Sequence, residues 1–112
     1  MGKAAAVDRR ALRARSRVFR ALGHPVRLLL AERLVDGARC VRELACAVGL
    51  DISTVSRHLA LLRDAGILES ERQGVQVVYR LRSPCVLRIF DCLDTVLDED
   101  RPAGGACRAD RG

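Results

Sequence analysis

The 112-residue sequence is poor in aromatic residues, with no tryptophan, one tyrosine and two phenylalanines. Proteins that hold single-stranded nucleic acids stack the bases on aromatic side chains, so this composition disfavours that class. No apolar run reaches the roughly 20 residues that a membrane-spanning helix needs. The first residues, MGKAAAVDRRALRARSR, carry arginines where a secretory signal has its apolar segment. We therefore expect a cytoplasmic protein that has no membrane partner.

The sequence also lacks a Cys-x-x-Cys motif, and no recognisable motif places a histidine beside a cysteine. A thiol enzyme is therefore disfavoured, and no catalytic cofactor is expected. In a reducing compartment, cysteines are better interpreted as thiols available to a soft metal ion or an oxidant than as disulfides. The five cysteines are Cys40, Cys46, Cys85, Cys92 and Cys107.

The length and charge indicate one small domain with a polyanionic partner. A chain of 112 residues can form a single modest core but not two. Its formal net charge is +6, and arginines are concentrated in the first third of the chain, whereas aspartates accumulate near the end. We expect residues 8–100 to form the domain, and residues 1–7 and 101–112 to be disordered.

Helical periodicity predicts four helices in the first two thirds of the chain. Apolar residues recur at helical spacing over residues 8–22, 26–34 and 41–48, and a possible short strand precedes the third helix. Asp51 is expected to cap a fourth helix by accepting a hydrogen bond from the backbone of Ser53 or Thr54. The three-residue turn GLD between the third and fourth helices is typical of a helix-turn-helix.

From residue 67 the apolar period changes to two, which predicts a β-hairpin with its turn at Gln73-Gly74. Residues 85–97 then return to helical spacing. A hairpin directly after a recognition-type helix is a wing. The predicted fold class is therefore mainly α with a small β wing, a winged helix-turn-helix in the order α-α-α-α-β-β-α.

The stretch DISTVSRHLALLRDAGIL has a leucine-rich face and an opposite face of short polar and basic residues. Val55, Leu59 and Leu62 form the expected buried stripe. Short hydrogen-bonding side chains suit a helix that enters the DNA major groove, although a merely solvated helix face is the alternative. The predicted DNA contacts are Ser53, Thr54, Ser56, Arg57 and His58 on the helix, and Arg72, Gln73, Gln76 and Arg80 on the hairpin. For the two glutamines, ordinary hairpin solubility is an equally good explanation.

The segment ELACAVGLDISTVSRHLALLRDAGILESERQGVQVVYRL resembles the winged-helix core of the ArsR/SmtB family of metal- and metalloid-sensing repressors. ALGHPVRLLLAERL is similar to the ALADPTRL segment of that family. The resemblance covers roughly residues 17–97. It implies a homodimeric repressor that sits on a palindromic double-stranded operator and leaves it when an inducer binds. It also implies that the first and last helices form the dimer interface.

The charge pattern independently suits such an interface, because an arginine-rich first helix can lie beside an aspartate-rich last helix. Exposed ion pairs contribute only about 0–1 kcal/mol each, and both helices can equally well be solvated. We expect apolar residues to supply most of the association energy. The predicted interface residues are Phe19, Leu22, Phe90, Leu93 and Leu97.

The thiols depart from the resembled family at one point. Its arsenic-sensing members often carry Cys-Val-Cys at the start of the third helix, whereas this sequence has Cys40-Val41-Arg42. Cys46 has apolar neighbours and is expected to be a small buried residue rather than a ligand. Cys107, in the tail, is interpreted as an incidental thiol, with a role as third ligand as the alternative.

The leading metal site combines Cys40, Cys85 and Cys92. Cys85 and Cys92 are seven residues apart, about 10 Å along a helix, which is too far to share one ion within a regular helix. Pairing of the short strand with the hairpin would bring Cys40 near Cys85, with Cys92 from the same or the other protomer. Three thiolates suit arsenite or antimonite, and cadmium, lead or zinc less well. A redox- or persulfide-responsive repressor is the alternative, because thiol positions alone do not distinguish the two.

Overall fold

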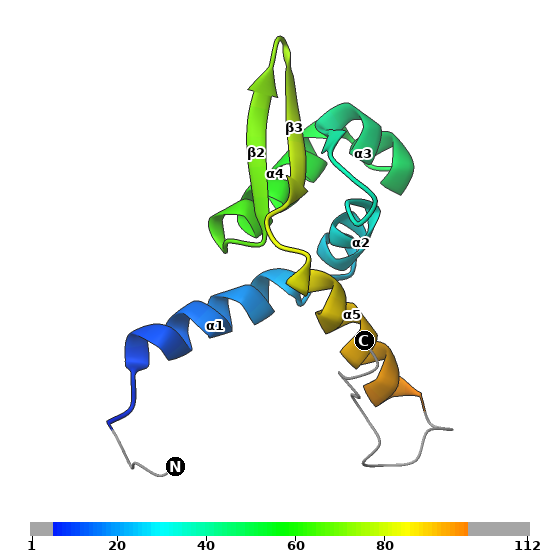
Figure 1. The fold of residues 1–112 in the computed structure, drawn as a ribbon. Helices are drawn as coiled ribbons and strands as arrows, with labels where there is room; N and C mark the ends of the chain where they lie inside the picture. Colours follow the sequence, from blue (N-terminus) through cyan, green and yellow to red (C-terminus); the bar gives the residue numbers. More distant parts are fainter. Residues whose placement is uncertain (1–5, 99–112) are drawn as a thin grey trace.

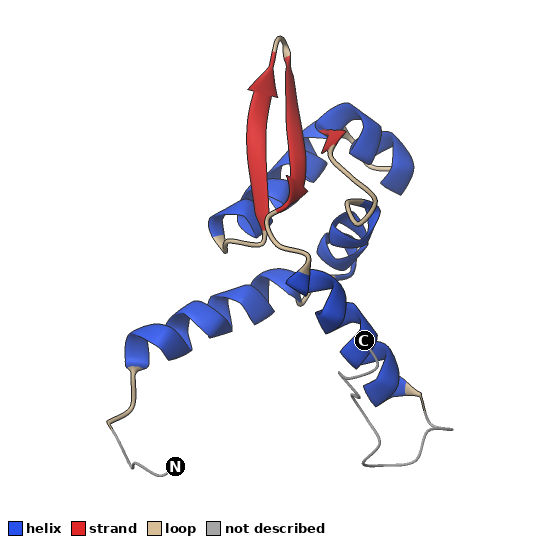
Figure 2. Cartoon of the chain, in the orientation of Figure 1, coloured by secondary structure: helices blue, strands red, loops and turns tan. Residues whose placement is uncertain are grey.

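The computed structural model describes residues 6–98, in which five helices and a three-stranded antiparallel sheet form a winged helix-turn-helix (Figures 1 and 2). This architecture confirms the predicted fold class. The predicted disordered ends lie outside these residues, apart from residues 6 and 7. The elements are α1 (Arg9–Leu22), α2 (Pro25–Arg33), β1 (Arg39–Cys40), α3 (Val41–Val48), α4 (Ile52–Asp64), β2 (Leu68–Gln73), β3 (Gln76–Leu81) and α5 (Cys85–Leu97).

The core lies where α2, α3 and α4 pack together beneath the sheet. Leu30 of α2 and Leu44 of α3 are fully buried, as are the three residues of the apolar stripe on α4. Tyr79 of β3 is 3% exposed and joins the same cluster. The predicted stripe of Val55, Leu59 and Leu62 is thus confirmed. It anchors one face of α4 and leaves the opposite face at the surface.

The turn between α3 and α4 is set by one glycine and one capping acid. Gly49 ends α3 with φ 74°, a left-handed conformation that glycine adopts without a steric penalty. Asp51 then caps α4, as predicted. The two helix directions differ by 110°, which lies in the range typical of a helix-turn-helix. Within residues 6–98 no single helix has the length and hydropathy to cross a membrane, and only α3 and α4 pass as a bent pair.

The wing is a regular hairpin that is joined to the helical part through β1. β2 and β3 pair from Leu68↔Leu81 to Gln73↔Gln76, with Gly74 at φ 65° in the turn. β1 pairs with the other edge of β3, so the strand order is β1-β3-β2. The predicted hairpin turn and short strand are therefore confirmed. β1 leads directly into α3, and α4 is followed by β2. The helix-turn-helix is therefore joined to the sheet at its start and at its end.

Helices α1 and α5 extend away from the rest of the molecule, on the side opposite the wing (Figure 1). Both carry large apolar side chains at the surface: Phe19 is 67% exposed, and Leu93 and Leu97 are 40% and 73% exposed. Leu22, which was predicted to lie at the dimer interface, is instead only 5% exposed. The chain reverses at Gly23 and folds α2 back over Leu22, so this side chain belongs to the protomer's own core.

Two groups of ion pairs are described within residues 6–98 of one protomer. Arg63 pairs with Asp64 on α4, and Arg80 of β3 pairs with Glu69 and Glu71 of β2. Charge attraction between α1 and α5 stays a prediction for the dimer.

Candidate DNA interface and thiol site

The N-terminus of α4 is organised by the carboxylate of Asp51. The backbone N–H of Thr54 donates to Asp51 Oδ2 at 3.4 Å, and the hydroxyls of Ser53 and Thr54 donate to its two oxygens at 2.7 and 2.6 Å. These donors stabilise the charged form and lower the pKa of Asp51 to about 2. Both hydroxyl protons are therefore used inside the cap. The oxygens of Ser53 and Thr54 can still accept hydrogen bonds from base amino groups.

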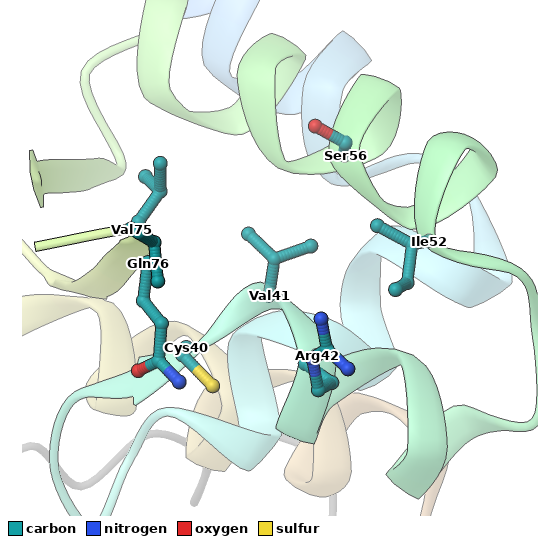
Figure 3. A pocket seen from close by; sticks show the side chains of 8 residues that line it. Cys40, Val41, Arg42, Ile52, Ser56, Val75 and Gln76 are labelled. Atoms are coloured by element: carbon teal, nitrogen blue, oxygen red, sulfur yellow. The ribbon is translucent and has the colours of Figure 1, made fainter.

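Ser56 and Arg57 lie one turn further along α4. Arg57 is exposed, whereas Ser56 is half-buried at the edge of a pocket of about 230 Å³ between α3, α4 and the wing. Figure 3 shows Val41 between Gln76 on the wing and Ile52 at the start of α4. The residues that line the pocket are Cys40, Val41, Arg42, Ile52, Ser56, Val75, Gln76 and Val77. The structure therefore brings Ser56 and Gln76, two predicted DNA contacts, to one concave surface.

His58 does not point outward with Arg57. Its ring is half-buried against the ring of His24, with 4.7 Å between centroids, and its Nδ1 lies 3.2 Å from Nη1 of Arg27. Burial is the largest cause that lowers the pKa of His58, followed by the charges of His24, Arg27 and Arg57. His24 itself caps α2, because its Nδ1 accepts from the backbone N–H of Val26 at 3.1 Å. His58 thus connects α4 to α2.

The predicted contacts on the wing fall into two groups. Arg72, Gln73 and Gln76 are exposed near the tip of the hairpin. Arg80 lies near the end of β3, away from the hairpin tip, and its guanidinium pairs with Glu69 at 2.9 Å and with Glu71 at 3.5 Å. These two carboxylates already offset the charge of Arg80. Arg72 is therefore the better placed of the two arginines to meet a DNA phosphate.

Two residues near the pocket escaped the sequence analysis. Arg42 is exposed in the first turn of α3, and Val75 is 95% exposed at the wing tip. Arg42 could have been found from its place just after the predicted short strand, since the start of the first helix of a helix-turn-helix lies near the DNA backbone. Nothing in the sequence marks Val75, because valine in a hairpin pattern is ordinarily an inward-facing residue.

The three cysteines of the leading metal site do not meet within one chain. Cys40 is 7% exposed and pairs with Val78, which precedes the end of β3 by three residues, or about 10 Å. Cys85 begins α5 beyond that end and is exposed. Among residues 6–98, no three His, Cys, Asp or Glu side chains gather closely enough to hold a metal ion. The structure therefore does not gather the three thiols into one site within the described part of a single chain.

Cys46 was expected to be buried, and this prediction is wrong, because the residue is exposed. The buried face of α3 is formed by Leu44 and Ala45, with Val48 half-buried. At about 100° per residue, Cys46 lies some 200° from both Leu44 and Val48, on the opposite side of the helix. Its apolar neighbours in the sequence are not its neighbours on the helix surface. Cys107 lies outside the described residues.

Taken together, the fold and the exposed face of α4 define a winged helix-turn-helix DNA-binding regulator. Residues 24–70 match the family model described as bacterial regulatory protein, arsR family. A biofilm growth-associated repressor of Xylella fastidiosa is 37% identical over 79 residues, which are 70% of this chain and 69% of that repressor. The chain belongs to the ArsR/SmtB family of transcriptional regulators, as the sequence resemblance indicated, and not to a family of enzymes.

Other relatives differ in length or have known structures. The transcriptional regulator Rv0324 of Mycobacterium tuberculosis is 35% identical over 84 residues, 75% of this chain, but the chain spans only 37% of that protein's length. The homodimeric winged helix-turn-helix DNA-binding domain of Mb0332 from Mycobacterium bovis has a TM-score of 0.74 at 34% identity, covering 87% of this chain and 92% of that one. The antimony-specific repressor AntR has a TM-score of 0.64 at 37% identity, covering 73% and 75%.

Proposed function

We propose that this ArsR-family DNA-binding repressor acts as a homodimer on a palindromic operator and is released when its thiols bind a soft metalloid, with arsenite or antimonite as the inducer. The observation that supports DNA recognition by α4 is that one face of this helix is buried and the opposite face is exposed. Val55 is fully buried, whereas Arg57, two residues on, is exposed, and Ser56 between them lines the pocket next to the wing. A helix held this way presents short side chains and one guanidinium to a groove.

Arg57→Ala is expected to weaken operator binding by about 5- to 150-fold, because a guanidinium that pairs with a guanine or a phosphate contributes about 1–3 kcal/mol. The binding constant is measured by fluorescence anisotropy, with a duplex selected from a random library by the wild-type protein. Arg63→Ala is the matched control: it lies on the same helix and pairs with Asp64 at 3.5 Å. Equal binding of Arg57→Ala and wild type across a salt titration would remove Arg57 from the interface.

We propose that α1 and α5 form the dimer interface. Phe19, Leu93 and Leu97 expose apolar surface on these helices, and Phe90 lies half-buried at their junction with the core. The similar Mb0332 domain is a homodimer, which supports the same arrangement here. A dimer would place two copies of α4 on one side, as two half-sites of a palindromic operator require.

For the inducer, we propose a thiol site that draws its cysteines from two protomers. Cys85 and Cys92 lie on α5, the helix that the proposed interface joins, and Cys40, the third proposed ligand, lies on β1. No group of three such ligands gathers among the described residues of one chain, which supports a site completed by a second copy. The similarity to an antimony-specific repressor supports this chemistry. The exposure of Cys85 favours a second candidate, oxidation of its thiol by a persulfide or other oxidant.

Arsenite is expected to weaken operator binding of the wild-type protein at least about 10-fold, the coupling typical of an allosteric repressor. Cys85→Ser should bind the operator normally and lose this response, and Cys40→Ser should do the same. Cys46→Ser, which changes an exposed thiol on α3, serves as the control and should keep it. Anisotropy titrations with arsenite, cadmium, zinc and tetrasulfide are compared side by side. A response to tetrasulfide alone would contradict a metalloid inducer and support the second candidate, oxidation of the thiols.

A further inference from the structure

Arg27 of α2 connects the end of α1 with the middle of α4. Its Nε donates to the backbone carbonyl oxygen of Ala21, in the last turn of α1, at 2.6 Å. Its Nη1 lies 3.2 Å from Nδ1 of His58 on α4. Both contacts are partly buried, and Ala21 is only 6% exposed. One planar guanidinium thus touches the helix proposed to join the protomers and the helix proposed to read DNA.

A second contact to the His58 ring comes from His24. The ring of His24 packs against it with an interplanar angle of 44°. His24 is itself held in place, because its Nδ1 caps the first turn of α2. Two residues therefore set the position of His58. They are His24, the N-cap of α2, and Arg27, three residues further along in α2.

The Arg27 contact requires one particular protonation state of His58. A guanidinium has only donors, so Nδ1 of His58 must accept and its proton must be on Nε2. A second proton on the ring would place an N–H opposite the N–H of Arg27. It would also add a positive charge beside Arg27 and Arg57. The contact therefore forms only with neutral His58.

We propose that Arg27 and neutral His58 form a positioning contact that fixes the reading helix α4 against the end of α1, so that operator binding weakens when His58 takes up a proton. This inference rests on the proposed role of α4 in DNA reading. It does not require His58 to touch DNA. Its role for His58 is to hold α4, the helix proposed to read DNA, in a fixed position relative to α1, the helix proposed to join the protomers.

The charged groups around His58 also favour its neutral form. The charged or titratable groups that face it are His24 and Arg27 from α2 and Arg57 from its own helix. α1, α3 and β2, which also pack against α4, add no charge that shifts the pKa of His58 among the described residues. Burial and these charges lower the pKa of His58 below its ordinary value of 6.5. The unfolded chain therefore takes up this proton first, and the contribution to stability is present above about pH 6.5 and is lost as the pH falls below it.

Operator affinity is measured by fluorescence anisotropy between pH 5 and pH 8 on the full chain. Between pH 8 and pH 5, the operator affinity of the wild type should fall about 5-fold more than that of His58→Gln. The amide oxygen of glutamine can accept a hydrogen bond from Arg27, but the side chain does not titrate. At pH 7.5, His58→Gln should bind within about 2-fold of wild type, whereas His58→Ala should bind about 5-fold more weakly. His24→Asn, which keeps a capping residue and removes the other histidine, should keep the decrease in acid, but at a higher pH, because one cause that lowers the pKa of His58 is lost. A His24→Asn variant with no decrease in acid would assign the titration to His24 and overturn the proposal.

A double-mutant cycle tests the contact itself. Arg27→Lys keeps the charge but cannot bridge Ala21 and His58, so it should weaken binding in the wild-type background and not in the His58→Ala background. Identical pH profiles of wild type and His58→Gln would overturn the proposal, as would additive effects in the cycle. If His58→Ala does not fold, the comparison of wild type with His58→Gln decides alone. A wild-type protein that selects no duplex would instead refute the proposed function.

Discussion

Replacing both Phe19 and Leu97 with glutamate is expected to convert the dimer into monomers and to weaken operator binding by at least about 1,000-fold. The two side chains are 67% and 73% exposed in one chain, so the change costs little within the protomer. In a dimer, each glutamate would replace an apolar side chain at the proposed interface, at a large desolvation cost. A monomer keeps one half-site and loses the specificity of two. Sedimentation equilibrium gives the mass, and anisotropy gives the affinity.

The matched control keeps the apolar surface. Phe19→Leu with Leu97→Ile should remain dimeric and bind the operator within a few fold of wild type, because these are conservative exchanges. Circular dichroism establishes that the glutamate variant is folded. A folded glutamate variant that stays dimeric with unchanged affinity would place the interface away from α1 and α5.

Leu59→Ala is expected to lower the free energy of unfolding by about 2–5 kcal/mol, since it leaves a cavity at a fully buried position. A small domain has about 5–15 kcal/mol in total, so this one change removes a large part of it. Leu61→Ala, on the same helix but 49% exposed, should change it by no more than about 0.5 kcal/mol. Urea denaturation at equal protomer concentration measures both, because dimerisation adds to the apparent stability. Similar losses for the two variants would mean that α4 is not anchored through this face.

The fold could be predicted because its signals are local in the sequence. The change from a helical period to a period of two after residue 66 marks the wing, and Asp51 marks the start of α4. Gly49 and Gly74 both adopt positive φ at the turns where the sequence places them. Each of these signals depends on residues within one turn or one hairpin.

The site was predicted less completely, because its contacts join distant parts of the chain. His58 was grouped with Arg57, yet it lies three residues after Val55 and four before Leu62, which puts it beside the buried face of α4. Its partners on α2 come from about 31 residues earlier, and no spacing rule predicts them. The surroundings of Cys40 likewise follow from the register of β1 on β3, which pairs it with Val78 and which composition does not reveal.

The outer edge of the wing has a further consequence for how copies of the chain can associate. β2 is bonded to β3 on one side only, so its other backbone edge is available to any extended peptide. The exposed outer half of β2 carries Glu71 and Arg72, and the neighbouring Glu69 pairs with Arg80 across the strands. Charges along a free edge discourage continuous strand addition, the route to fibrils. The charged edge of β2 therefore discourages open-ended strand pairing between copies of the chain, and neutral apolar substitutions along β2 would favour such pairing.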